Sequence, residues 1–416
     1  MLLVLIWTWP LAAQSVNARF STSLYTWERQ LSETESQNRL RLYQTLQLTV
    51  GQMAGQKLSA HFYGQLSGDL AQSAEDDPIP RVYNFYLQWY DRKGVLERVK
   101  LGRLRSYAGV AYGTVDGVDV SLRFGKYFKL GGFVGALVPF SNRVEVGNWD
   151  DHHAFGLRLS TRQLLGSTIL LSFVQRNRRP APYAQPGRYT QKRLTFQSLE
   201  QRLVGIDVYR RFGRRATAYA RLDYDLLQER VRRGQVELNL QPAERWRVTL
   251  DFMHRAPLLE ANSIFWVFQT STIQDFGLRA SWQVRPAWSL YADVGYVNYA
   301  SDETVRFGLG VRGPYGFLGY NFRSGYGGAS NGVNANFRYP LTLQVGVIAS
   351  LGFSRYSLFR EDFDKYSATT GSLGFYFRPA RSFSLDVLGQ ALSNRFYKRD
   401  ARIFVKANYW IFTSKR

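Results

Sequence analysis

The 416-residue chain contains no cysteine. This absence excludes disulfide frameworks, thiolate metal sites and cysteine nucleophiles, and it is compatible with folding in an oxidising compartment. Long hydrophobic runs are missing as well: no window of about 18 apolar residues occurs, which excludes a helical membrane protein. With 36 glycines and 15% aromatic residues, the composition also differs from that of an average soluble enzyme. The chain is therefore either soluble or crosses a membrane as strands.

The only continuous apolar segment is at the start of the sequence, where residues 1–13 read MLLVLIWTWPLAA. A segment of about 13 residues is too short to span a bilayer as a helix. The small residues Ala12 and Ala13 before Gln14 resemble a cleavage site, so we predict that residues 1–13 are a signal peptide for export. Residues 14–416 are then expected to form one domain, because a single pattern continues to the C-terminus.

That pattern is a series of segments of about ten residues in which apolar and polar residues alternate. In ETVRFGLGVRG, Val305, Phe307 and Leu309 are separated by Arg306 and Gly308. The same alternation occurs in HAFGLRLSTR, DFGLRASWQV and ERWRVTLDFM. Strands that face lipid on one side and a polar interior on the other have this dyad period. We predict an all-β fold, a closed antiparallel transmembrane β-barrel with an even number of strands, about 22 (range 18 to 22).

The breaks between these segments alternate in length. Short breaks such as DRKG, FGRR, RPAW and RGPYG have the glycine and proline chemistry of tight turns. Most of the breaks between them are longer and more polar, for example AQSAEDDPIP, RSYAGVAYG and PFSNRVEVGNWDDH. Short periplasmic turns and longer extracellular loops are typical of barrels in the outer membrane of Gram-negative bacteria. Aromatic residues near segment ends, such as Tyr86, Trp89 and Tyr90, fit interfacial girdles.

The charge balance is strongly basic, with 54 lysines and arginines against 32 acidic residues and a net charge of +22. A cation on the lipid face costs about 2–4 kcal/mol near the midplane, so we predict that the strand cations line the pore lumen. The predicted pore-lining cations are Arg98, Lys100, Arg123, Arg158, Arg162, Arg221, Arg245, Arg247, Arg279, Arg306, Arg323 and Lys406.

Acidic residues share the same polar face of the strands. They are Asp119, Asp207, Asp223, Asp225, Asp251, Asp275, Asp293 and Asp386. The cations therefore either form a lattice of salt bridges that stiffens the wall, or leave a positive surplus that concentrates anions in the lumen.

One segment carries a resemblance to a known family. Residues 99–125, VKLGRLRSYAGVAYGTVDGVDVSLRFG, contain a Gly-Arg pair, a glycine-rich loop and an Asp-Gly-Val sequence. This pattern resembles one hairpin of the porin-like outer-membrane channels of the alginate-export type. The resemblance implies a large barrel with a basic lumen that passes anionic or sugar-like solutes, with Arg103 and Asp116 at the charged positions of the motif. The remainder of the chain does not recognisably follow that family.

A barrel of about 22 strands encloses a lumen so wide that something should fill or narrow it. Two segments are poorly suited to an outer surface, the glycine-rich residues 107–113 and the apolar residues 256–268. We predict that both fold inward. The candidate constriction residues are Arg103, Tyr107, Asp116, Ser263 and Phe265.

Signals for other chemistry are sparse. The four histidines, His61, His152, His153 and His254, fit no nucleophile and base motif, so no catalytic residue is predicted. The run from Asp150 to His153 lacks further partners at ligand spacing, so no metal and no cofactor are predicted. The basic residues are dispersed at strand period rather than clustered, which argues against nucleic-acid binding.

These patterns predict a passive channel in outer-membrane lipid for small anionic or acidic, sugar-like solutes, without enzyme activity. Two other classes stay open. One is a barrel sheath or scaffold that holds a partner protein across the outer membrane, which a purified barrel that conducts alone would argue against. The other is a barrel enzyme acting on lipids, which a rim-facing serine beside a histidine would favour.

Overall fold

The computed structural model describes most of the chain. The described residues are 15–30, 35–53, 57–71, 77–179, 183–185, 192–194, 200–257, 272–299, 302–325, 328–357, 365–396 and 400–414. The predicted signal peptide, residues 1–13, lies outside this part, as do the candidate constriction residues Ser263 and Phe265.

Strands make up nearly all of the described residues. In chain order they are β1 (Ser15–Gln30), β2 (Ser36–Gln52), β3 (Leu58–Asp69), β4 (Ile79–Tyr90), β5 (Leu96–Ala108), β6 (Ala111–Phe124), β7 (Phe128–Leu137), β8 (His152–Thr161), β9 (Ser167–Arg178), β10 (Tyr183–Gln185), β11 (Lys192–Leu194), β12 (Gln201–Phe212), β13 (Ala216–Asp225), β14 (Arg230–Leu240), β15 (Trp246–Arg255), β16 (Ile273–Arg285), β17 (Trp288–Tyr299), β18 (Glu303–Gly313), β19 (Gly316–Gly325), β20 (Ser330–Pro340), β21 (Val345–Tyr356), β22 (Tyr366–Ala380), β23 (Phe383–Ser393) and β24 (Asp400–Ser414).

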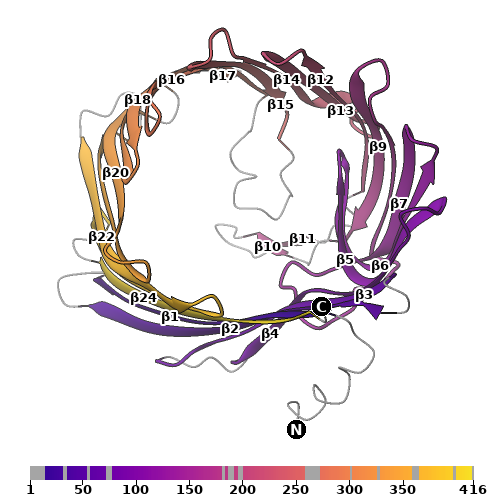
Figure 1. Ribbon diagram of the computed structural model, residues 1–416, viewed down its shortest axis with the longest axis horizontal. Coiled ribbons are helices and arrows are strands. Elements are labelled where there is room, and N and C mark those ends of the chain that lie inside the picture. Colours follow the sequence, from indigo (N-terminus) through magenta and orange to yellow (C-terminus); the bar gives the residue numbers. More distant parts are fainter. Residues whose placement is uncertain are drawn as a thin grey trace.

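Twenty-two of the described strands form one closed antiparallel sheet (Figure 1). Each strand pairs with its neighbour in sequence, and β9 pairs directly with β12. The first and last strands close the ring, with Ser15 opposite Ser414 and Arg29 opposite Asp400. Closure satisfies the backbone groups that would otherwise form open edges, which a strand in lipid requires. The predicted closed barrel of about 22 strands is confirmed.

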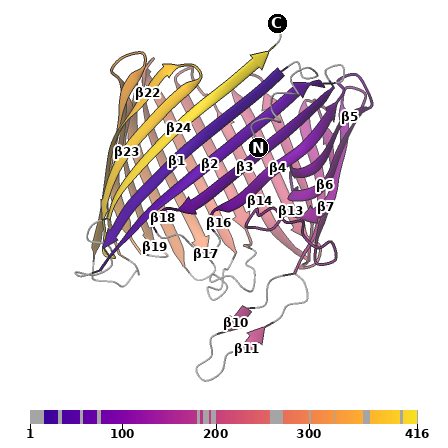
Figure 2. The same cartoon turned by 90° about the horizontal axis from the view of Figure 1, so that it is seen from below.

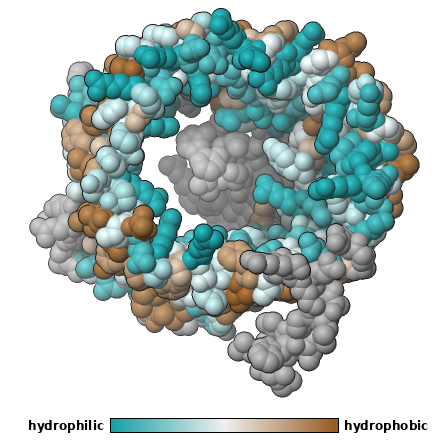
Figure 3. Space-filling model, viewed as in Figure 1, coloured by the Kyte–Doolittle hydropathy of each residue, from teal (hydrophilic) through white to brown (hydrophobic). Residues whose placement is uncertain are grey.

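The alternation of the sequence maps onto the two faces of this wall. Val305, Phe307 and Leu309 point outward from β18, and Leu309 is 44% exposed. The polar residues between them point inward. Arg306 donates to Asp275 of β16 at 2.6 Å across the inner face, and Asp293 of β17 lies on that same face, over Gly308 of β18. Figure 3 shows the same division, with hydrophilic residues bordering the central opening and hydrophobic residues on the outside. The barrel thus has an apolar outer surface for lipid and a polar lumen.

The two ends of the barrel differ in their connections. Nine short turns of the described residues gather at one end, here called the turn end: residues 91–95, 125–127, 162–166, 213–215, 241–245, 286–287, 314–315, 341–344 and 381–382. Figure 2 shows this end uppermost, beside the C-terminus. Neighbouring turns are tied together by Lys57 and Asp91, whose Nζ and Oδ2 atoms are 2.7 Å apart. This hydrogen bond lowers the pKa of Asp91, so the pair stays charged at neutral pH.

The opposite end, here called the loop end, carries the longer connections. There β10 and β11 form a small separate hairpin between β9 and β12. It projects beyond the rim of the barrel in Figure 2. Among the described residues, no helix is long and apolar enough to cross a bilayer.

Candidate functional site

The β5–β6 hairpin leaves the barrel wall and lies inside it (Figure 1). A row of three glycines marks the bend, because Gly102 of β5 pairs with Gly117 of β6, and Gly117 pairs with Gly135 of β7. Gly102 has a φ of +125°, which side-chain-bearing residues rarely adopt. Without side chains at these three positions, the backbones approach closely enough for the hairpin to turn sharply inward.

The tip of this hairpin rests on the lumen face of β9 and β12. The backbone N–H of Val110 donates to Ser172 Oγ at 3.0 Å. Val110 is 1% exposed, and its Cγ1 lies 2.8 Å from where a Cβ on Gly205 would be. Residues 107–113, predicted from sequence to fold inward, therefore lie against the inner wall. The segment RSYAGVAYG is a continuation of β5 and β6 with a two-residue turn, not the longer loop that the sequence pattern predicted.

An apolar cluster inside the lumen holds the hairpin to the wall. Its members are buried residues from both partners: Leu104, Val110, Ala111 and Val115 of the hairpin, and Phe133, Leu137, Ala154 and Val174 of β7 to β9. Burying one valine or leucine contributes about 1.5–3 kcal/mol. A cluster of this size makes the hairpin a fixed part of the lumen.

A buried ion pair secures the base of the hairpin. Arg103 donates from Nε and Nη2 to the two carboxylate oxygens of Asp116, each at 2.8 Å. Its remaining donors reach three carbonyls, those of Val82 at 3.1 Å, Arg143 at 2.8 Å and Glu145 at 2.7 Å. Arg103 is 7% exposed, so this latch ties the hairpin to β4 and to the β7–β8 connection. The Asp116 side chain is 15% exposed, so the pair lies at the base of the hairpin with its carboxylate partly accessible.

Replacing Arg103 by glutamine is expected to lower the free energy of unfolding by about 3 kcal/mol, because the largely enclosed Asp116 carboxylate loses its counter-charge. Urea unfolding of the protein in liposomes measures the difference. Arg105→Gln is the matched control, because Arg105 lies on the same strand but is exposed, and surface changes usually stay within about 0.5 kcal/mol. Equal losses for both variants would contradict the latch.

The face of the hairpin opposite the apolar cluster is directed toward the lumen. Tyr107 is 70% exposed on this face and Tyr112 is 40% exposed. The Arg176 guanidinium stacks on the Tyr112 ring at 4.4 Å and donates to its hydroxyl at 3.1 Å. Two tyrosines and the exposed Arg105 therefore border the opening that the hairpin leaves.

Half of the predicted pore-lining cations have a carboxylate partner. Arg98 and Arg158 share Asp119, at 3.1 and 2.7 Å. The other pairs are Arg123 with Glu97, Arg221 with Asp207 and Asp223, Arg279 with Asp251, and Arg306 with Asp275. All six of these cations lie on the inner face by strand register, so the salt-bridge lattice is present in part.

Other predicted cations are not matched in this way. Within the described residues, no carboxylate lies within 4.0 Å of Lys100, Arg162, Arg245, Arg247 or Lys406. Arg323 is not in this group, because it interacts with another residue. Lys100 stacks on Tyr86 with its Nζ 4.8 Å from the ring. Arg162 and Arg245 lie in turns, beside the ends of β8 and β15, so they are at the mouth and not within the wall.

Carboxylates shared between cations leave local surpluses of positive charge. Asp119, only 1% exposed, receives both Arg98 and Arg158. Glu97 likewise binds Arg123 and also Lys129, the latter at 2.7 Å. Each of these clusters has one more cation than carboxylate.

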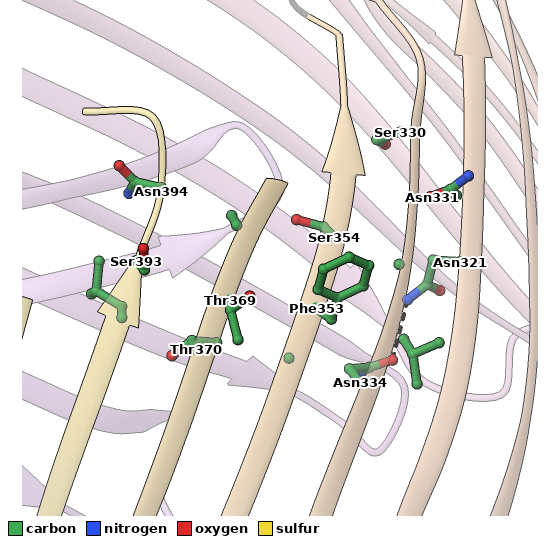
Figure 4. A pocket seen from close by; sticks show the side chains of 15 residues that line it. Asn321, Ser330, Asn331, Asn334, Phe353, Ser354, Thr369, Thr370, Ser393 and Asn394 are labelled. Carbon is green, nitrogen blue, oxygen red and sulfur yellow. Dashed lines mark hydrogen bonds between the residues drawn. The ribbon is translucent and has the colours of Figure 1, made fainter. Parts of the chain in front are cut away.

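A hollow elsewhere in the lumen wall is lined without any charged side chain. Between β19 and β23, near the loop end, a hollow of about 430 Å³ is lined mainly by asparagine, serine, threonine and glycine. Figure 4 shows this wall, with Asn321 donating to Asn334 at 3.3 Å. The lumen therefore has a crowded side that carries the hairpin and, near the loop end between β19 and β23, a neutral hollow with small polar groups.

The histidines are placed separately from one another. His61 stacks on Tyr86 with ring centroids 4.7 Å apart and contacts the Ser59 hydroxyl at 3.0 Å. His153 donates from Nδ1 to the carbonyl of Trp149 in the β7–β8 connection at 2.8 Å. In the part of the chain that the structure describes, no three residues of the ligating types come together as a metal site.

Several lumen residues were missed by the sequence reasoning. Tyr112 belongs to residues 107–113, which were expected to fold inward, and Arg105 lies two residues before them. Alternation alone did not assign either side chain to a face. Glu97 lies at a register shift between Leu96 and Arg98, where strict alternation does not assign its side chain to a face. Arg312 had a signal that could have found it, because it follows Arg306 on the polar face of the same alternating segment.

Solved structures share this fold at low sequence identity. The ferric enterobactin receptor PfeA of Pseudomonas aeruginosa matches with a TM-score of 0.59 and 10% identity, covering 96% of this chain and 82% of that one. The P pilus usher PapC of E. coli, in a pilus tip assembly intermediate, matches with a TM-score of 0.54 and 10% identity, covering 97% and 62%. OccAB4 of Acinetobacter baumannii matches at 0.44 and 10%, covering 97% and 100%.

No family model matches the sequence, and no curated protein sequence matches it. The structural similarities show the fold, which is that of outer-membrane β-barrels. The resemblance to alginate-export channels stays a prediction.

Proposed function

We propose that the protein is an integral outer-membrane channel for the passive diffusion of small anionic solutes, including acidic sugars. The observation that carries this proposal is the surplus of inward-facing cations. Arg247 and Lys406 face the lumen with no carboxylate within 4.0 Å among the described residues, and Asp119 and Glu97 each bind two cations. Such a charged wall attracts anions and repels cations.

The β5–β6 hairpin supports the size limit in this proposal. A barrel of about 22 strands has a wide lumen unless something occupies it. The hairpin is held inward by the apolar cluster and by the latch of Arg103 and Asp116. Solutes would pass between its exposed face, with Tyr107 and Arg105, and the neutral hollow between β19 and β23.

The protein reconstituted alone in planar bilayers is expected to conduct and to prefer chloride over potassium. The reversal potential under a KCl gradient measures this preference. Replacing Arg245, Arg247 and Lys406 together by glutamine is expected to move the reversal potential toward that of a non-selective pore, because three unpaired cations leave the lumen field.

A triple glutamine variant of Arg210, Arg214 and Arg215 is the control. It removes the same charge from the outer face and from the turn after β12, outside the lumen. Its selectivity should stay close to that of the unchanged protein. Equal shifts in both triple variants would reject the luminal assignment, and a barrel that does not conduct alone would favour the sheath for a partner protein.

A further inference from the structure

A second hollow lies at the turn end of the lumen wall, between β15 and β18. It has a volume of about 440 Å³ and carries three arginines, Arg245, Arg247 and Arg312. Its lining also contains Glu244 and neutral donors, including Ser281, Gln283 and Ser289. We name it the basic hollow.

Strand register arranges these groups in two adjacent rows. In one row, Gln283 of β16 pairs with Ser289 of β17, which pairs with Arg312 of β18, and the N–H of Gln283 donates to the carbonyl of Arg245 at 2.8 Å. In the other row, Arg247 pairs with Ser281, and Ser281 with Tyr291.

The arginines thus stand on opposite flanks of the hollow. Three strand spacings of about 4.8 Å place their backbones roughly 14 Å apart. Arginine side chains of that separation can converge on one ligand from both sides.

The floor between the flanks is a fixed aromatic ring. Tyr291 stacks on Phe317 with ring centroids 5.4 Å apart and an interplanar angle of 18°. A Cβ on Gly319 would lie 2.6 Å from the Tyr291 hydroxyl, and one on Gly310 would collide with the ring. The two glycines therefore allow Tyr291 to lie flat along the wall.

The charges of the basic hollow are only partly balanced, because its described lining has three arginines and one carboxylate residue, Glu244. Within the described residues, no carboxylate lies within 4.0 Å of Arg245, Arg247 or Arg312, and Glu244 makes no ion pair there. Elsewhere on the same strands, Arg279 and Arg306 are each paired with an aspartate. Three guanidinium groups around one polar hollow repel one another unless an anion joins them, and guanidinium binds oxyanions in bidentate geometry.

We propose that the basic hollow is a binding site for solutes with two or more oxyanion groups of the phosphate or carboxylate type. This rests on the proposed channel function, since the site would hold such a solute at the turn-end mouth of the pore. Arg245 and Arg247 would bind one oxyanion group and Arg312 a second, with Tyr291 beneath and Ser281 and Gln283 donating between them.

Block of the chloride current by pyrophosphate, and separately by citrate, tests the site. Each is expected to block saturably from the turn end. Arg247→Gln with Arg312→Gln should raise the half-blocking concentration about tenfold or more, because the site loses charge-assisted hydrogen bonds from both flanks. Block by only one of the two anions assigns the site to that oxyanion type.

The double variant Arg338→Gln with Arg378→Gln is the matched control. Both arginines lie at the turn end and stack on Tyr376, at 4.4 and 5.2 Å, outside the basic hollow. This control removes the same charge and should leave the half-blocking concentration nearly unchanged. Equal weakening in both double variants would overturn the site, since the effect would then come from the general field.

Calorimetric binding of pyrophosphate to the full chain in detergent separates the two proposals. Saturable binding that Arg247→Gln with Arg312→Gln removes supports the site even if the bilayer shows no chloride preference. An anion-selective pore without saturable binding overturns the site and leaves the channel proposal standing.

Discussion

A Gly117→Val variant is expected to fail to form the folded barrel. A Cβ at Gly117 would collide with the carbonyl oxygen of Val134 and would lie 2.6 Å from Cα of Gly135. Backbone atoms cannot move aside as a side-chain end can, so β6 and β7 would have to separate at the bend. Heat-modifiable migration of the protein on electrophoresis, which distinguishes folded from unfolded barrels, measures the loss.

Gly371→Val is the matched control. Gly371 lies on β22 with no heavy atom within 4 Å of its virtual Cβ and no unusual φ, and valine favours strands. This variant is expected to fold normally. Normal folding of Gly117→Val as well would show that the glycine row is not needed for the bend.

The outer wall was predictable from the sequence because its physics is repetitive. In β18 each apolar residue faces lipid and each polar one faces water, so a period of two appears in the sequence. The tight turns were predictable for a similar reason, since RPAW and RGPYG supply the proline and glycine that two-residue connections need. Both signals are local, and together they predict the closed barrel and its strand number.

The local sequence pattern does not predict the position of the infolded β5–β6 hairpin. Along β5, Leu101 is 56% exposed on the outer face, and alternation would put Arg103 on that face too. Arg103 is instead buried, because carbonyls of Arg143 and Glu145 come from a connection 40 residues later. A backbone acceptor leaves no trace in the sequence pattern. The Gly-Arg and Asp-Gly pairs of residues 99–125 mark this hairpin as unusual in the sequence, but they do not show that it folds into the lumen.

Charge pairing in the lumen was only partly predictable. Cross-strand register brings Asp207 opposite Arg221 and Asp386 opposite Lys406, yet only the first of these pairs is within 4.0 Å. Which cation keeps a partner depends on side-chain rotamers and on bulges such as that between Leu96 and Arg98. The sequence could name the cations of the polar face, but not the subset that stays unpaired.

A change at the tip of the β5–β6 hairpin is expected to have a second large effect, an increase in the single-channel conductance. Val110→Asp is expected to release the tip from the wall and to raise the single-channel conductance severalfold. The new carboxylate would be buried beside the Gly205 backbone, in a region that two acids already border: a Cβ on Gly109 would lie 3.0 Å from Asp207 Oδ2, and a Cβ on Gly205 would lie 3.0 Å from Asp223 Oδ1. A buried, unpaired charge next to two like charges is strongly unfavourable, so the tip should move into water and widen the pore.

Two further variants make this prediction specific. Val110→Ala removes packing without adding charge, so its conductance should stay near that of the unchanged protein. Because the chain has no cysteine, Val110→Cys with Ser172→Cys can tie the tip to β9 by a single disulfide, and oxidation should then leave conductance unchanged. If Val110→Asp folds and conducts as the unchanged protein does, the hairpin does not set the width of the lumen, and the narrowing element has to lie elsewhere in the barrel.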